Sequence, residues 1–95
     1  MRKKQIARLR QEIERLRRSG GVKSRELQEL AKSLGRKRHN RGKEPNWVSE
    51  IFDDVFPISI PDHPGDLNKY TARGILSQLE NDLDKLEETL ADQEG

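Results

Sequence analysis

Two histidines, His39 and His63, are the side chains of this 95-residue chain that titrate near neutral pH, and the chain contains no cysteine. Either histidine could give or take a proton in a reaction. The simpler interpretations are a solvated residue at a strand end for His39 and a turn residue bonded by Asp62 for His63. Neither histidine has the spacing of a metal site and the acidic residues are scattered, so no metal or cofactor is expected.

A basic run precedes the only tryptophan of the chain. Five of the eight residues from 36 to 43 are cationic, namely Arg36, Lys37, Arg38, Arg41 and Lys43. Cations along a sheet edge suit the phosphates and 2′-hydroxyls by which duplex RNA is recognised, and an ordinary solvated face is the alternative. Trp47 could stack on a base, but a chain with 31% apolar residues needs its tryptophan in the core.

Hydrophobic spacing predicts three helices that would position these side chains. The first ends at the Ser-Gly-Gly of residues 19–21 and has the stripe Ile6, Leu9, Ile13 and Leu16. The second is capped by Ser24, stops at Gly35 and has the face Leu27, Leu30, Ala31 and Leu34. The last is capped by Thr71 and has the face Ile75, Leu76, Leu79, Leu83, Leu86 and Leu90. Gly74 inside it should cost about 1 kcal/mol relative to Ala, and close approach to a neighbour is the expected reason.

Residues 36–60 predict two or three short strands that turn at Asp53-Asp54. Pro57 restricts the strand through Ile58 and Ile60 to an edge, or to pairing beyond the proline. The fold class is therefore α+β, with an α-β-β-β-α order in which two helices lie on one face of a small antiparallel sheet. The expected core is Leu27, Leu30, Leu34, Ile58, Ile60, Ile75 and Leu79.

The two ends of the chain have opposite charge. Residues 1–18 carry eight Lys/Arg and two acids, whereas residues 77–95 carry one Lys and seven acids. Both ends carry apolar seams of three-four spacing, so we expect them to pair as an antiparallel coiled coil, either within one chain or in a homodimer. The rival hypothesis makes the basic helix an RNA-binding arm.

The resemblance to a known family rests on two segments. Residues 60–69, IPDHPGDLNK, and residues 71–79, TARGILSQL, are similar to the last strand, turn and final helix of the HicA family, toxins of bacterial toxin–antitoxin systems. Residues 23–35, KSRELQELAKSLG, are similar to the first helix of that family. The resemblance covers about residues 22–80 and implies a double-stranded-RNA-binding-like (dsRBD-like) core. It also implies mRNA as the target, mRNA interferase activity and a HicB-like antitoxin as partner. Residues 1–19 and 81–95 are then helical extensions.

The family's catalytic segment does not carry over. Family members have Ser/Thr-His after a glycine near the sheet, whereas Gly42 is followed here by Lys43-Glu44. His39 could replace that histidine only through a register shift, and His63 lies in the matched turn. Lys69 and Arg73, also in the matched part, join the basic run as predicted RNA-binding residues.

Two functions remain open, and RNA cleavage is undecided in the first. The first is a HicA-like toxin or toxin-derived RNA-binding protein that acts on mRNA. The second is a non-catalytic RNA- or protein-binding module that assembles through its coiled-coil ends. No run of residues is apolar enough to span a membrane, and a cytoplasmic location is expected.

Overall fold

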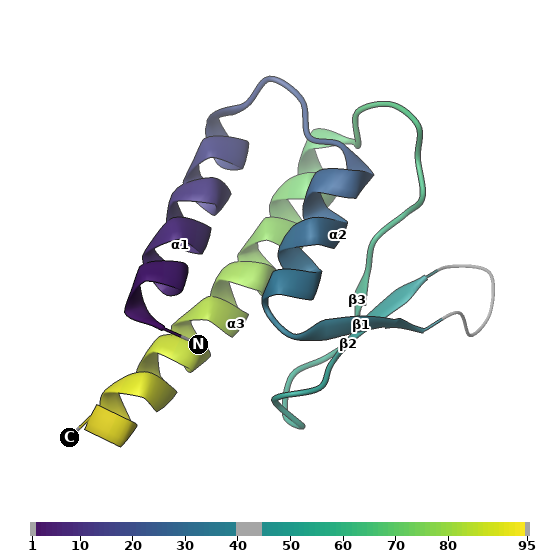
Figure 1. Cartoon of the computed structure of the whole chain (residues 1–95). Helices are drawn as coiled ribbons and strands as arrows, with labels where there is room; N and C mark the ends of the chain where they lie inside the picture. Colours follow the sequence, from purple (N-terminus) through teal and green to yellow (C-terminus); the bar gives the residue numbers. More distant parts are fainter. Residues whose placement is uncertain (1, 40–44, 95) are drawn as a thin grey trace.

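A computed structural model describes residues 2–39 and 45–94, and within them the chain forms three helices and a three-stranded antiparallel sheet. The elements follow in the order α1 (Lys3–Arg18), α2 (Ser24–Ser33), β1 (Arg36–His39), β2 (Asn46–Ser49), β3 (Ile58–Ser59) and α3 (Lys69–Glu94), as Figure 1 shows. The α+β class and the α-β-β-β-α order from α2 to α3 are confirmed. Arg41, Lys43 and the substituted Gly42-Lys43-Glu44 segment lie outside the described residues.

The sheet has the order β1-β2-β3, so β2 is its central strand. Trp47 pairs with Arg38 on one side and with Ile58 on the other. Ile58 follows Pro57 directly, so β3 is an edge strand that pairs beyond the proline, as the sequence predicts. Asp53 and Asp54 lie in the connection between β2 and β3.

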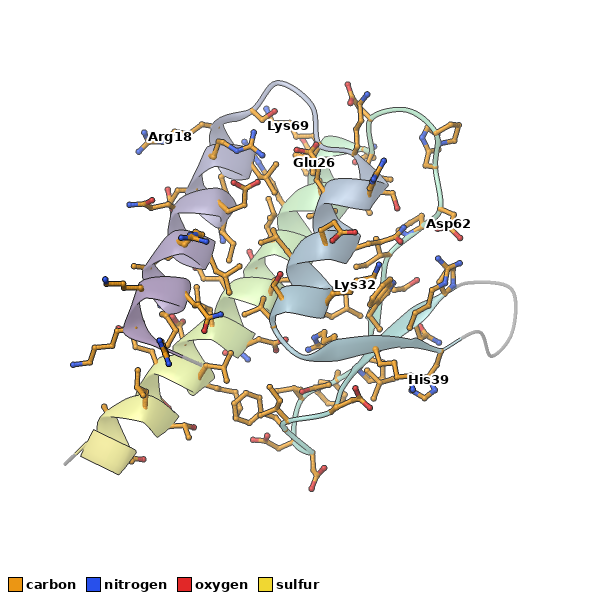
Figure 2. The ribbon with its side chains drawn as sticks, viewed as in Figure 1. Arg18, Glu26, Lys32, His39, Asp62 and Lys69 are labelled. Carbon is orange, nitrogen blue, oxygen red and sulfur yellow. The ribbon has the colours of Figure 1, made fainter. Side chains whose placement is uncertain are left out.

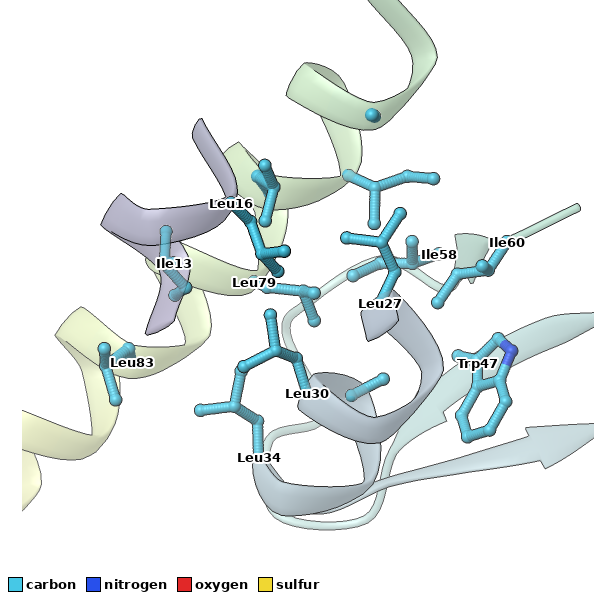
Figure 3. Close-up of a cluster of buried hydrophobic side chains, with 14 of the residues drawn as sticks. Ile13, Leu16, Leu27, Leu30, Leu34, Trp47, Ile58, Ile60, Leu79 and Leu83 are labelled. Atoms are coloured by element: carbon cyan, nitrogen blue, oxygen red, sulfur yellow. The ribbon is translucent and has the colours of Figure 1, made fainter. Parts of the chain in front are cut away.

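The core lies between the sheet and the helices (Figure 3). Trp47 and Ile58 occupy paired positions on β2 and β3 and are both buried, so the two side chains face the same layer. Their cluster includes every core residue predicted from the sequence, namely Leu27, Leu30, Leu34, Ile58, Ile60, Ile75 and Leu79. Trp47 is 1% exposed and belongs to this core, as its hydrophobic setting predicts.

Helix α1 packs antiparallel against α3 within the one chain (Figure 1). Ile6, Ile13 and Leu16 are buried in the common core, as the predicted stripe requires. Arg10 bonds Glu87 at 2.7 Å and Asp84 at 3.0 Å, and Arg17 lies 3.3 Å from Glu80. The opposite charges of the two ends therefore meet without a second copy of the chain. Helix α3 also runs continuously through residue 80, where the acidic extension was expected to begin.

The predicted caps are wrong in detail. Helix α2 has Lys23 at its N-cap, and the Lys23 backbone N–H donates to the Glu26 carboxylate at 3.1 Å. Ser24 is buried inside the first turn, where its Oγ accepts a hydrogen bond from Gln28. Helix α3 begins before Thr71, and Asn68 Oδ1 accepts the Tyr70 N–H at 2.9 Å instead. At each of these helix starts one backbone N–H donates to a side-chain oxygen, but a neighbouring residue supplies that oxygen.

Of two glycines singled out in the sequence, Gly35 behaves as predicted and Gly74 does not. Gly35 follows α2 with φ at +85°, the left-handed conformation that commonly ends a helix. A Cβ at Gly74 would meet nothing within 4 Å, so the predicted close approach at this glycine is wrong.

Across the described ranges, no helix combines the length and apolar content needed to cross a membrane.

Candidate nucleic-acid interface

The first residue of the basic run, Arg36, is a core residue and is withdrawn from the predicted RNA-binding set. Its side chain is 2% exposed, and Nε and Nη2 donate to the two carboxylate oxygens of Asp82 at 2.6 and 2.9 Å. Nη1 donates to the backbone carbonyls of Trp47 at 2.8 Å and Phe56 at 3.1 Å. Arg36 therefore joins β1 and β2 to α3 and cannot reach an RNA phosphate.

Lys37 and Arg38 are exposed on β1, where successive side chains point to opposite faces of the sheet. Arg38 donates two hydrogen bonds to the Asp62 carboxylate, which also accepts one from Gln28 at 3.1 Å. The Arg38 guanidinium is the main reason why the pKa of Asp62 lies below its usual value. The charge of Arg38 is thus partly compensated, and Lys37 is the freer cation of the pair for contact with RNA.

The two candidate catalytic histidines lie on separate elements. His39 is exposed at the end of β1, opposite Asn46 of β2 (Figure 2). His63 is exposed in the segment between β3 and α3, and its Nδ1 accepts the Gly65 backbone N–H at 3.1 Å. The predicted bond from Asp62 to His63 is wrong, because Asp62 pairs with Arg38. With Nδ1 as acceptor, a neutral His63 carries its proton on Nε2.

The other predicted RNA-binding residues, Lys69 and Arg73, are exposed one turn apart at the start of α3. Tyr70 lies between them in sequence and is 80% exposed. Tyr70 is not among the residues predicted from the sequence, although an aromatic residue with cations on both sides is a signal for nucleic-acid contact. Figure 2 shows Lys69 at the start of α3 and His39 far from it, at the end of β1. The predicted residues therefore form two groups, one on β1 and one at the start of α3.

Within the described residues, no three His, Asp or Glu side chains gather in a way that could hold a metal ion. Comparison with models of protein families, with curated proteins and with solved structures finds no match to this chain. The candidate site residues that the structure leaves exposed are thus cations on β1 and α3, the two histidines and Tyr70.

Proposed function

We propose that this chain is a HicA-like RNA-binding protein that acts on mRNA and is controlled by a HicB-like antitoxin. One observation carries the proposal: cations from two distant segments, Lys37 on β1 and Lys69 with Arg73 on α3, lie exposed on one α-β-β-β-α core. dsRBD-like cores contact RNA at separate points along its backbone, through phosphates and 2′-hydroxyls. Two basic groups on separate elements suit that mode of contact.

Acidic side chains in the later part of α3 support the proposal because they pair with other residues. Asp82 forms a buried ion pair with Arg36, while Asp84 and Glu87 pair with Arg10 of α1. Two acids near the end of α3 thus have a cation of α1 as partner, whereas Lys69 and Arg73 are exposed at the start of α3. A negatively charged ligand would approach the start of α3 rather than its acidic end.

Cleavage of RNA is the weaker part of the resemblance. Gly42-Lys43-Glu44 stands where the family has glycine followed by Ser/Thr-His. The remaining histidines, His39 and His63, lie on separate elements. General acid–base catalysis needs the group within hydrogen-bond reach of the proton that it moves, and two exposed histidines on different elements would have to meet one RNA site. We therefore place RNA binding before RNA cleavage in the proposal.

The test is incubation of the purified chain with a labelled mRNA, followed by a binding assay and a cleavage assay. Lys37→Gln and Lys69→Gln should each weaken binding, and Lys4→Gln on α1, which removes the same charge elsewhere, should leave it nearly unchanged. Log affinity should fall linearly with log salt concentration, as it does for phosphate contacts. Absence of salt-sensitive binding by the wild type would sink the proposal.

The same experiment addresses the two histidines. If the wild type cleaves RNA and His39→Ala or His63→Ala abolishes cleavage, that histidine takes part in catalysis. Cleavage retained by both variants would rule both out. Binding without cleavage would support a toxin-derived binding protein.

A second candidate function is a module that binds another protein, such as the antitoxin, through the β2–β3 connection. Phe56 in this connection is 83% exposed, and Ile51 is also exposed. Exposed apolar side chains that gather in one part of the surface are a feature of protein–protein contacts. The test is co-purification with the product of a neighbouring gene. Phe56→Ser should reduce recovery of that product if this connection is the contact, and unchanged recovery would exclude it.

A further inference from the structure

A small pocket lies where the end of α1 meets the start of α3. Its volume is about 160 Å³, and the 20–21 glycine turn and the segment before α3 complete its wall. Ligand pockets for drug-sized molecules measure about 300–1,000 Å³, so this pocket suits a single small group. We call the pocket together with Tyr70, which follows Lys69 in sequence, the α1–α3 corner. Its charged residues are Arg17, Asp66, Lys69 and Arg73.

The pocket is set up to take a negative charge. Among the described residues that line it, Arg17, Lys69 and Arg73 are cations and Asp66 is the one carboxylate. Arg17 pairs with Glu80 at 3.3 Å, but its Nε is buried and has no hydrogen-bond partner. The Arg17 side chain is 30% exposed, and the guanidinium donors that Glu80 does not engage suit the oxygens of an anion. The start of α3 adds the positive end of a helix dipole.

Backbone packing builds the wall of the pocket. A Cβ on Gly21 would meet the carboxylate of Asp66, so the glycine lets the turn after α1 lie close to this side chain. The Leu67 N–H donates to the Val22 carbonyl at 2.8 Å and joins the same two segments. The pocket therefore exists before a ligand arrives and needs little ordering to bind one.

Tyr70 adds an exposed ring next in sequence to a residue of the pocket wall. It lies on the first turn of α3, next to Lys69 and three residues before Arg73, and its ring is left in solvent. Exposed aromatic side chains beside cations serve as stacking platforms for the bases of single-stranded nucleic acid, while the cations hold the backbone. Bases inside a duplex are already stacked on one another, so the ring favours an unpaired strand.

We propose that the α1–α3 corner is a binding site for single-stranded RNA, in which the pocket takes one backbone phosphate and Tyr70 stacks on an adjacent base. This inference rests on the proposed RNA-binding function and adds the form of RNA and the site. It also gives α1 a part in RNA binding through Arg17, a residue outside the segment that resembles the HicA family.

The test compares the full chain with three variants by fluorescence anisotropy. The variants are Lys69→Gln/Arg73→Gln, Tyr70→Ser and the charge-matched control Lys4→Gln/Arg8→Gln, whose residues lie exposed near the start of α1. The probes are a short labelled single strand, the same strand in a duplex, and a single strand with abasic sites. All substituted residues are exposed, so thermal melts should confirm that each variant folds as the wild type does.

The double variant in the corner should lower the magnitude of the salt slope by about 0.7 for the single strand, the contribution of one phosphate. Tyr70→Ser should weaken binding of the intact single strand by about fivefold to a hundredfold, the range for one stacked base, and should not affect the abasic strand. The control pair should retain most of the wild-type affinity for the single strand.

Two outcomes overturn the inference while leaving RNA binding in place. In the first, the corner variants bind the single strand as tightly as the control pair. In the second, the wild type prefers the duplex and Tyr70→Ser has no effect. If the wild type binds none of the probes, the proposed RNA-binding function itself is wrong. This result differs from the two outcomes above because it is seen with the wild type alone.

Discussion

Asp82→Asn should destabilise the folded chain by about 3–5 kcal/mol, the usual cost of removing one partner of a buried ion pair. The carboxylate of Asp82 accepts hydrogen bonds from Nε and Nη2 of Arg36, and both side chains are almost completely buried. The Asn amide keeps one acceptor but presents N–H donors where the second oxygen was. Arg36 would then remain charged and buried, with one of its donors facing another donor.

The expected loss is large for a protein of this size. Natural domains have unfolding free energies of about 5–15 kcal/mol, so the variant could lose half or more of the total. A loss of 1 kcal/mol lowers the melting temperature of a domain of 60–100 residues by about 4–8 °C. The melting temperature should therefore fall by about 12–40 °C.

Urea denaturation followed by the fluorescence of Trp47 is a suitable assay, because Trp47 is buried and its carbonyl accepts a hydrogen bond from Arg36. The matched control is Asp84→Asn, which removes the same charge from an exposed pair with Arg10 and should cost less than about 1 kcal/mol. The double variant Arg36→Met/Asp82→Leu should recover much of the loss, because no buried charge remains unpaired. Equal, small losses for Asp82→Asn and Asp84→Asn would refute the reasoning.

Three further predictions concern the packing of α1, the interior of α3 and the edge of the sheet. Ile13→Ala should cost about 2–5 kcal/mol in urea denaturation, because Ile13 is fully buried in the common core, and an unchanged midpoint would show that α1 adds no stability. Gly74→Ala should raise the unfolding free energy by about 1 kcal/mol, since a Cβ there meets nothing within 4 Å, and a lower melting temperature would contradict this. Arg38→Gln should raise the pKa of Asp62 toward its usual value in a carboxyl NMR titration, because Arg38 is the main cause of the lowered pKa. In the wild type, the stabilisation from that carboxylate is present at neutral pH and is lost as the pH falls below the usual aspartate range and through the lowered pKa of the folded state.

Local pattern was enough to predict most of the fold. The three-four spacing of residues such as Leu27, Leu30 and Leu34 marks a helix and its buried face, because only one side of an amphipathic helix can turn inward. The opposite charges and matching seams of the two ends predicted that they pair, and α1 lies along α3. The caps were predicted less well, because several neighbouring side chains can satisfy the same free N–H groups.

The candidate site was less predictable, because exposure depends on contacts far along the chain. Lys69 and Arg73 were identified from the sequence, but the pocket that they share with Arg17 requires α1 to lie beside the start of α3. The cations near Tyr70 were a signal for nucleic-acid contact, but the sequence did not show that the ring is exposed, since a tyrosine is intermediate between buried and exposed residue types.

Arg36 and Lys37 show most clearly where the information in the sequence ends. By itself the sequence determined that a basic strand follows α2 and that its side chains alternate between two faces. Only the tertiary structure decided which cation is buried and so removed from the surface. Asp82 lies 46 residues away from Arg36 and meets it through the packing of α3. A buried charge needs a partner of opposite sign, and that partner is positioned by the fold rather than by the neighbours of Arg36 in sequence.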